Sequence, residues 1–326
     1  MEKKYYNNLI VSSSPHMVSN ENTQRIMGMV ILALLPSLCV STYVFGPRVL
    51  ILTAVCMVSA VLFEYLWNVL MKKPQTVGDL SAALTGLLIA FNVPSNLPYY
   101  IAIIGSFIAI IIVKQLFGGL GHNLFNPAIT ARIVLFIAFA TQMTTWPVPR
   151  TAATDAITGP TPLGILKNGG GELPSNMDLF LGTVGGSMGE VSAIALIIGG
   201  LFLIWRKVIS PITPLCFIAT VFIIALIAGE DPVFHILAGG VMLGAFFMAT
   251  DYVTTPLLPW GKVIFGVGCG IMTMLIRLFG SYPEGVSFGI LLMNILTPHI
   301  ENFCTNRLYK PKKEKKAKKG GAEDAE

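Results

Sequence analysis

Long apolar runs, separated by short polar or charged connections, make up most of this chain. A helix that crosses a bilayer needs about 20 mostly apolar residues, so each run bounded by charge, proline or polar clusters is a candidate membrane span. The pattern predicts ten spans, namely Ile26–Phe45, Val49–Met71, Leu80–Val93, Tyr99–Val113, Pro127–Gln142, Val191–Trp205, Ile209–Ala228, Phe234–Ala249, Val263–Phe279 and Val286–Phe303.

Several of these spans, among them the third, fifth, sixth and eighth, are short. Short spans adjoin Pro94, Pro127 and the turn at residues 250–259. A membrane tolerates a broken helix only where protein or a cavity satisfies the freed backbone groups. We therefore predict broken helices at these places.

A short sequence echo indicates two related halves. Residues 114–119 (KQLFGG) precede the fifth span, and residues 277–281 (RLFGS) precede the tenth. Because five helices per half is an odd number, the second half is inverted in the membrane, with a ligand or ion site expected near the midplane. The sequence thus predicts an all-α polytopic membrane protein with two inverted five-helix repeats, residues 26–142 and 190–303.

The distribution of basic residues predicts the orientation. With ten spans, both termini lie on one side, and most lysines and arginines gather there, whereas the opposite side carries only Arg48, Arg150, Lys167 and Arg277. The positive-inside rule then places the N-terminal segment (residues 1–25) and the Lys-rich tail (residues 304–326) in the cytoplasm. Residues 143–189 are then expected to form an extracytoplasmic loop of a multi-pass membrane protein.

Composition supports this class and excludes others. Hydrophobic residues make up 54% of the 326 residues and charged residues only 12%, against roughly 25% charged in soluble domains. The net charge of +5 comes largely from the tail, so no nucleic-acid-binding surface is expected. No cleavable signal peptide is recognised at the start.

The residues that usually carry catalysis are sparse. The five cysteines stand singly and are expected to be buried thiols, and the four histidines lack a second ligand at metal spacing. We therefore predict no metal site and no catalytic side chain. His235 is expected to be a satisfied interior histidine.

Acidic residues near apolar spans are functional candidates, because an unpaired charge in lipid is costly. Asp79 and Asp251 stand at the ends of the broken third and eighth spans, and both are candidates for an ion path. Glu284 is a third candidate, with pairing to Arg277 as the structural alternative. Glu64 lies inside the second span, while Glu190 and Glu301 sit near helix ends, where solvated carboxylates are expected.

The predicted external loop contains the segment DAITGPTPLG, residues 155–164. Small residues around Thr161, stiffened by two prolines, would present its hydroxyl on an exposed turn that a phosphate could approach. From the residues alone, an ordinary turn is the simpler interpretation.

That segment resembles the Asp-x-x-Ser-Gly-Ala-Thr motif, on which FMN is attached by a phosphoester bond to the last threonine. The motif occurs in the family shared by the B subunit of sodium-translocating NADH:quinone oxidoreductase and the D subunit of the Rnf complex, an ion-translocating ferredoxin:NAD oxidoreductase. The resemblance implies covalent FMN at Thr161, with Asp155, Thr158 and Gly159 in the attachment motif. Thr158 replaces serine and Pro160 replaces alanine, and neither change removes the acceptor hydroxyl.

Further blocks resemble the same family in the same order, from about residue 14 to residue 303. They are residues 14–16 (SPH), 117–127 (FGGLGHNLFNP), 247–254 (FMATDYVT) and 282–286 (YPEGV). The chain is compact, with no long extension before the first span. In this it resembles the Rnf D subunit more than the quinone-reductase B subunit.

The second of these blocks has two interpretations. Its glycines expose backbone amides, and Asn123 and Asn126 offer donors and acceptors for a neutral polar ring; the resemblance implies noncovalent riboflavin there. The structural alternative is a helix entry, with Asn126 as the cap and Pro127 at the first helical position.

The resemblance implies a membrane subunit that relays electrons between flavins on opposite faces of the bilayer. No GxGxxG follows a strand and no cysteine cluster exists, so other subunits must bind NAD and iron-sulfur clusters. The resemblance also implies a second covalent-FMN subunit among the partners. Two alternatives remain at this point: a subunit of a quinone-reducing relative, and a non-redox channel or transporter built on an inverted repeat.

Overall fold

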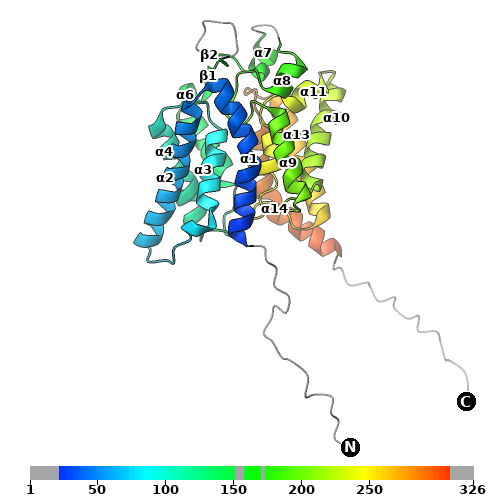
Figure 1. Cartoon of the computed structure of the whole chain (residues 1–326). Coiled ribbons are helices and arrows are strands. Elements are labelled where there is room, and N and C mark those ends of the chain that lie inside the picture. Colours follow the sequence, from blue (N-terminus) through cyan, green and yellow to red (C-terminus); the bar gives the residue numbers. More distant parts are fainter. Residues whose placement is uncertain (1–21, 151–157, 170–172, 309–326) are drawn as a thin grey trace, which may run out of the picture.

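The structure, a computed structural model, describes residues 22–150, 158–169 and 173–308. Within these ranges the chain forms a helical bundle with one short pair of strands at one end (Figure 1). The N-terminal half contains α1 (Thr23–Phe45), α2 (Arg48–Leu70), the 3-10 turn η1 (Val77–Asp79), α3 (Ser81–Phe91), α4 (Tyr99–Phe107), the π-helix η2 (Ile108–Gln115) and α5 (Pro127–Ala138).

A connection follows with α6 (Ala140–Thr144), β1 (Trp146–Pro147), β2 (Thr158–Gly159), α7 (Pro162–Asn168) and α8 (Asn176–Leu181). The C-terminal half contains α9 (Ala193–Trp205), α10 (Ile212–Ala228), α11 (Pro232–Leu237), α12 (Val241–Leu243), the π-helix η3 (Gly244–Met248), α13 (Pro259–Phe279) and α14 (Val286–Leu308). The segment predicted only as a loop thus carries two short helices and a strand pair.

The helices identify a multi-pass membrane protein. In the part of the chain that the structure describes, α1, α2 and α13 are long and apolar enough to cross a bilayer. Five shorter apolar helices accompany them, namely Ser81–Phe91, Tyr99–Gln115, Pro127–Ala138, Ala193–Trp205 and Ile212–Ala228. The all-α membrane class is confirmed, and the number of ten spans stays a prediction.

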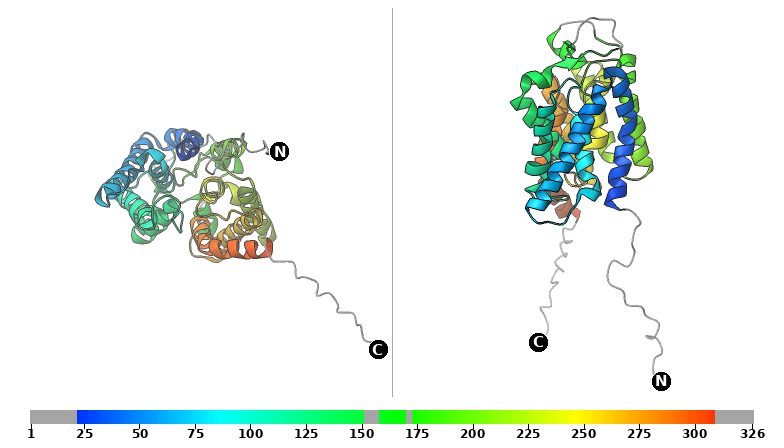
Figure 2. Two further views of the ribbon diagram at one scale, coloured as in Figure 1. Left: turned by 90° about the horizontal axis from the view of Figure 1, so that it is seen from below. Right: turned by 60° about the vertical axis from the view of Figure 1, so that its left-hand side comes forward.

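The two ends of the bundle differ. The start of α1 and the end of α14 lie at one end, called here the terminal side, and α7, α8 and the strands lie at the other, the loop side (Figure 1). Seen along the bundle, the two halves form neighbouring groups of helices (Figure 2). Helix α2 packs on α3 and α4 in one half, as α10 packs on α11 and α13 in the other.

Two helices stop inside the bundle. α3 ends at Phe91, and the chain then runs through a mostly buried stretch, residues 92–97, before α4 begins. In the other half, α11 ends at Leu237, and α12 and η3 continue only after residues 238–240. The first break lies at Pro94, as predicted. The second interrupts the predicted span Phe234–Ala249, which was expected to be continuous and to break only at the turn that follows it.

Among the contacts between the two halves, two join corresponding helices. α1 packs against α9, where a Cβ on Gly199 would lie 2.2 Å from the carbonyl oxygen of Ala33. Only glycine allows this close approach of two helices. The second meeting place joins α5 to α14.

Candidate functional site

A cavity of about 280 Å³ on the loop side contains the predicted attachment residue Thr161 in its wall. Thr161 is the residue before α7, and its Oγ1 accepts a hydrogen bond of 3.1 Å from the backbone N–H of Gly164. Its exposed fraction is 6%. The expectation of an exposed turn is therefore wrong for the residue, because capping α7 turns the hydroxyl toward the protein.

The residues just before Thr161 are held by strand pairing. Thr158 and Gly159 form β2, which pairs antiparallel with Trp146 and Pro147 of β1. Thr158 is exposed and Gly159 half-buried. Asp155, the first residue of the motif, lies outside the described residues.

Aromatic rings form much of the loop-side cavity. Phe136 of α5 meets the ring of Tyr282 edge to face at 5.0 Å between centroids, and Tyr282 stacks on Phe288 with an angle of 12° between the planes. Trp146 of β1 also lines the cavity. Such a wall suits a flat, conjugated ring better than a hydrated ion.

A buried ion cluster forms the polar part of the same wall. Arg132 of α5 donates one hydrogen bond from Nη1 to Glu190 at 3.1 Å and another from Nη2 to Glu284. Nη1 also reaches Oδ1 of Asn92 at 2.9 Å. The guanidinium of Arg132, in the N-terminal half, therefore binds two carboxylates that follow residues 143–189 in the sequence.

These contacts correct two expectations about the acids. Glu284 binds Arg132, whereas Arg277 donates to the carbonyl oxygens of His235 and Ala238 at 2.6 and 3.0 Å. Glu190 is buried in its ion pair instead of solvated. In both cases a charge on a distant helix supplied the partner, which local spacing does not show.

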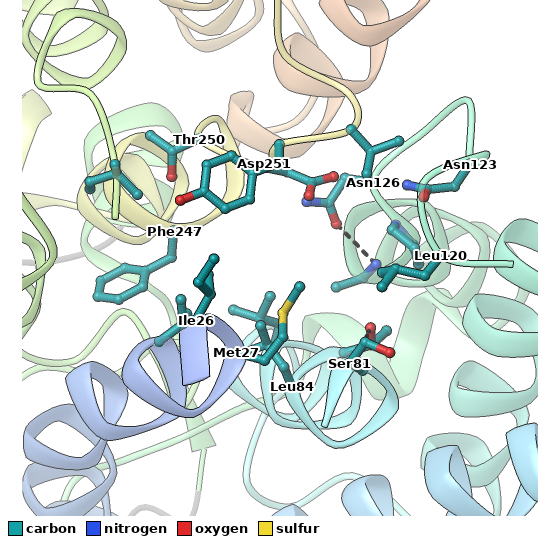
Figure 3. Close-up of a pocket in the computed structure, with 18 of the residues that line it drawn as sticks. Ile26, Met27, Ser81, Leu84, Leu120, Asn123, Asn126, Phe247, Thr250 and Asp251 are labelled. Carbon is teal, nitrogen blue, oxygen red and sulfur yellow. Dashed lines mark hydrogen bonds between the residues drawn. The ribbon is translucent and has the colours of Figure 1, made fainter. Parts of the chain in front are cut away.

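A second cavity lies on the terminal side, between α1, α3, the entry to α5 and the end of η3 (Figure 3). Asn126 and Asp251 both point into it, with Ser81 and Ile26 on the opposite walls (Figure 3). Asn123 completes this side, and its Nδ2 donates to the carbonyl of Phe125 at 3.0 Å.

Asn126 has two roles, one for each end of its amide. Its Oδ1 accepts from the backbone N–H groups of Ala128 and Ile129 at 3.1 and 3.3 Å, and Pro127 occupies the first turn of α5. This confirms the predicted cap. Its Nδ2 donates to the carbonyl of Met248 at 3.3 Å, which ties the cap to the end of η3.

The two acids predicted for an ion path, Asp251 and Asp79, lie in different surroundings. Asp251 lines the terminal-side cavity just after η3, and its Oδ2 accepts from the Thr254 hydroxyl at 3.0 Å. Asp79 ends the 3-10 turn η1 before α3 and is half-buried. It is absent from the residues that line the described cavity.

Glu64 is fully committed to a buried network beside that cavity. Lys114 of η2 donates to both of its carboxylate oxygens at 3.0 Å and to Ser81 at 2.7 Å. Gln115 and Thr76 add further hydrogen bonds to Glu64 at 3.1 and 2.8 Å. The wide turn of the π-helix presents Lys114 and Gln115 to the same carboxylate.

Buried polar contacts link the two cavities. Asn92, which touches Arg132 at the loop side, lies 3.8 Å through Nδ2 from the sulfur of Met248. The carbonyl of Met248 in turn accepts from Asn126 on the terminal side. All four side chains are buried, so the two sites are connected through the protein interior.

Sequence reasoning missed Asn92, Arg132 and the aromatic wall. Arg132 carried a usable signal, since a charge inside a predicted span is a functional candidate by default.

The expectation of buried cysteines holds for Cys56, Cys269 and Cys304 but is wrong for Cys39, which is exposed on α1, while Cys216 is intermediate. His235 is buried and bonded to Glu230, as expected for an interior histidine. Among the described residues, no three His, Cys, Asp or Glu side chains gather as metal ligands.

Comparison with known proteins gives one consistent result. The profile of the NQR2, RnfD, RnfE family matches residues 10–310. The chain is 51% identical to the D subunit of the Na(+)-translocating ferredoxin:NAD(+) oxidoreductase complex of Acetobacterium woodii, over 95% of this chain and 99% of the relative. It is 45% identical to the D subunit of the proton-translocating ferredoxin:NAD(+) oxidoreductase complex of Clostridium ljungdahlii, over 90% of this chain and 93% of the relative.

A more distant relative carries a broader name. The chain is 39% identical to the D subunit of an ion-translocating oxidoreductase complex of Stutzerimonas stutzeri, over 88% of this chain and 92% of the relative.

Proposed function

Because the chain belongs to the NQR2, RnfD, RnfE family, we propose that it is the D subunit of an ion-translocating ferredoxin:NAD oxidoreductase complex. In this role it carries FMN on Thr161 and relays electrons across the bilayer. The observation that carries the proposal is the pair of cavities at opposite ends of the bundle, joined by buried polar contacts. An electron can then cross inside a single subunit.

The loop-side cavity fits FMN by shape and chemistry. When bound, FMN supplies one- and two-electron redox chemistry at this site. Thr161 would hold FMN through Oγ1, where the phosphoester would take the place of the hydroxyl proton; the oxygen would still have a lone pair for the Gly164 N–H that it accepts now. Phe136, Trp146 and Phe288 would supply apolar contacts to the ring, and Arg132 places positive charge in the same wall.

The terminal-side cavity is proposed to bind riboflavin without a covalent bond. Asn123 and Asn126 contribute amide groups, while Leu84, Leu120 and Phe247 supply apolar walls. Gly119 and Gly121, on either side of the cavity residue Leu120, adopt positive φ angles that favour glycine. A neutral ring suits a cavity with this mixture of amide and apolar groups.

We further propose ten spans arranged as two inverted five-helix repeats. The corresponding packing of α2 on α3 and α4 and of α10 on α11 and α13 supports the repeat, as do the two interrupted elements. With the basic side inward, both termini are cytoplasmic and Thr161 faces the outside of the prokaryotic cell membrane. The terminal-side cavity then opens toward the cytoplasm.

Partners follow from what this chain lacks in its sequence, which has neither a cysteine cluster nor a dinucleotide-binding motif. Iron-sulfur and NAD chemistry, and a second covalent FMN, are proposed for other subunits. Ion identity differs even among relatives, since one printed name specifies Na(+) and another the proton.

The ion path is proposed to include Asp251, with Asp79 and Glu284 as further members. Asp251 shares a cavity wall with Asn126, so charge on a ring held there would act on this carboxylate at short range. Low dielectric around the cavity strengthens that interaction. An acid placed this way can bind a cation as an electron arrives.

The test of covalent FMN uses two threonines of one loop. Thr161→Ala should abolish the flavin fluorescence that migrates with the denatured chain and remove the mass of FMN from the purified subunit. Thr158→Ala, at an exposed position of β2, should have a milder effect on both signals, because its hydroxyl would only orient the loop. Covalent flavin on the Thr161→Ala chain, or its absence from the wild-type chain, would refute the assignment.

A further inference from the structure

Glu284 occupies a special position in the loop-side cavity. It and Thr161 line this cavity together, and they also share the wall of a smaller neighbouring cavity. The Glu284 side chain retains 19% exposure, whereas that of Glu190 retains 3%. Of the two carboxylates bound to Arg132, Glu284 is the one that solvent in the cavity can reach.

The hydrogen bonds divide the two oxygens of Glu284. Oε2 binds Arg132, and Oε1 has no hydrogen-bond donor in the part of the chain that the structure describes. One carboxylate oxygen is thus held while the other stays available to a proton. Arg132 keeps its second partner, Glu190, so protonation of Glu284 does not leave the guanidinium without a counter-charge.

We propose that Glu284 takes up a proton from the loop-side solvent when an electron enters the loop-side cavity. This inference rests on the proposed attachment of FMN to Thr161. The electron adds one negative charge to the cavity, the proton adds one positive charge to Glu284 at Oε1, and the carboxylate becomes a neutral carboxylic acid. Charge in the cavity wall is then balanced without moving Arg132.

Burial and the surrounding charges bring the pKa of Glu284 close to neutral pH, where the carboxylate can gain or lose a proton. Burial, followed by the nearby carboxylate of Glu190, raises the pKa of Glu284 to about 7, against the opposing effect of Arg132 and Arg277. An added negative charge in the cavity raises this pKa further.

Two further elements pack around the connection that bears Glu284. Lys167 of α7 donates to the carbonyls of Gly280 and Tyr282, and the His235 and Glu230 pair lies behind Arg277. Neither Lys167 nor the His235 and Glu230 pair binds the Glu284 carboxylate. The charged groups that act on Glu284 are Arg132, Glu190 and Arg277.

The pH dependence of the flavin midpoint potential tests the proposal in the purified complex. Uptake of one proton per electron lowers the potential by up to about 59 mV for each tenfold fall in proton concentration, between the pKa values of Glu284 before and after reduction. In Glu284→Gln this contribution should disappear. An infrared difference spectrum should likewise lose a carboxylic acid band that appears on reduction of the wild type.

Glu190→Gln is the matched control. It removes the other carboxylate from Arg132 but leaves Glu284 in the cavity, so the pH-dependent step should persist and move to lower pH, because a neighbouring negative charge is lost. If the ion cluster were only structural, Glu284→Gln and Glu190→Gln would not have these different effects on the pH dependence of the midpoint potential.

The outcomes separate the two proposals. Covalent flavin at Thr161 with the same pH dependence in wild type and Glu284→Gln would overturn the role of Glu284 alone. A wild-type chain without covalent flavin would overturn both.

Discussion

The ammonium group of Lys114 lies 3.0 Å from each carboxylate oxygen of Glu64, and both side chains are almost completely buried. The pair joins η2 to α2 and reaches α3 through Ser81. Such a pair stabilises little by itself, because desolvation of two charges offsets their attraction. Removing one partner of the pair is therefore expected to destabilise the protein more than replacing both partners by apolar side chains.

This predicts a strongly non-additive pair of substitutions. Glu64→Leu or Lys114→Met alone should lower the free energy of unfolding by about 3–5 kcal/mol, since each leaves one buried charge unpaired. The double variant Glu64→Leu/Lys114→Met should recover most of that loss. Thermal unfolding in detergent measures all three, and exposed Lys72→Met is the control; additive losses would contradict the prediction.

Asn126→Ser should separate the helix cap from the ring contact. Serine is as good a cap as asparagine, so the stability of α5 should change by only a few tenths of a kcal/mol. The amide donor to Met248 is lost, and riboflavin released by acid precipitation should fall sharply while covalent FMN stays. Normal riboflavin content in this variant would remove Asn126 from the terminal-side ring site.

Asp251→Asn should uncouple ions from electrons. The amide preserves shape and the contact with Thr254 while removing the charge, so the complex should keep both flavins but lose ion-dependent turnover or ion uptake. Asp79→Asn, outside the cavity lining, is the comparison and should have the smaller effect. Wild-type ion uptake in Asp251→Asn would exclude this acid; loss of flavin or assembly would show a structural role and move the assignment to Asp79.

Labelling of single cysteines tests the orientation. In a chain without its five native cysteines, a cysteine at Asn168 on the loop side should react with a membrane-impermeant maleimide in intact cells. One at Lys73, in the exposed connection after α2, should react only after permeabilisation. The reverse pattern would place the termini outside.

The membrane class and the helix break at Pro94 could be read from the sequence because both depend on local composition, whereas the break inside the predicted span Phe234–Ala249 could not. Asn126 followed by Pro127 predicted the start of α5 correctly, since capping is a property of adjacent residues. The hydroxyl of Thr161 was expected to be exposed, and it is buried because its surroundings come from α5, β1 and the connection before α14.

The partners of the charged residues could not be predicted in the same way. Arg132 and Glu284 are 152 positions apart, and their pairing depends on how the two halves meet. Local proximity suggested Arg277 for Glu284, yet Arg277 is occupied by carbonyl oxygens that the break after α11 leaves free. A single sequence contains the charges but not their three-dimensional arrangement.

The contact between Gly199 and the carbonyl of Ala33 restricts how ions can move. Transporters that alternate access rock one half of the molecule against the other, and here such rocking would have to pull α1 from α9 and, at the same time, Arg132 from Glu190 and Glu284. Close backbone packing on one flank and a buried ion cluster on the other oppose such rocking. We therefore expect an ion on the proposed path to move by rotamer changes and proton exchange at individual side chains, which would couple the electron and the ion without a large movement of either half.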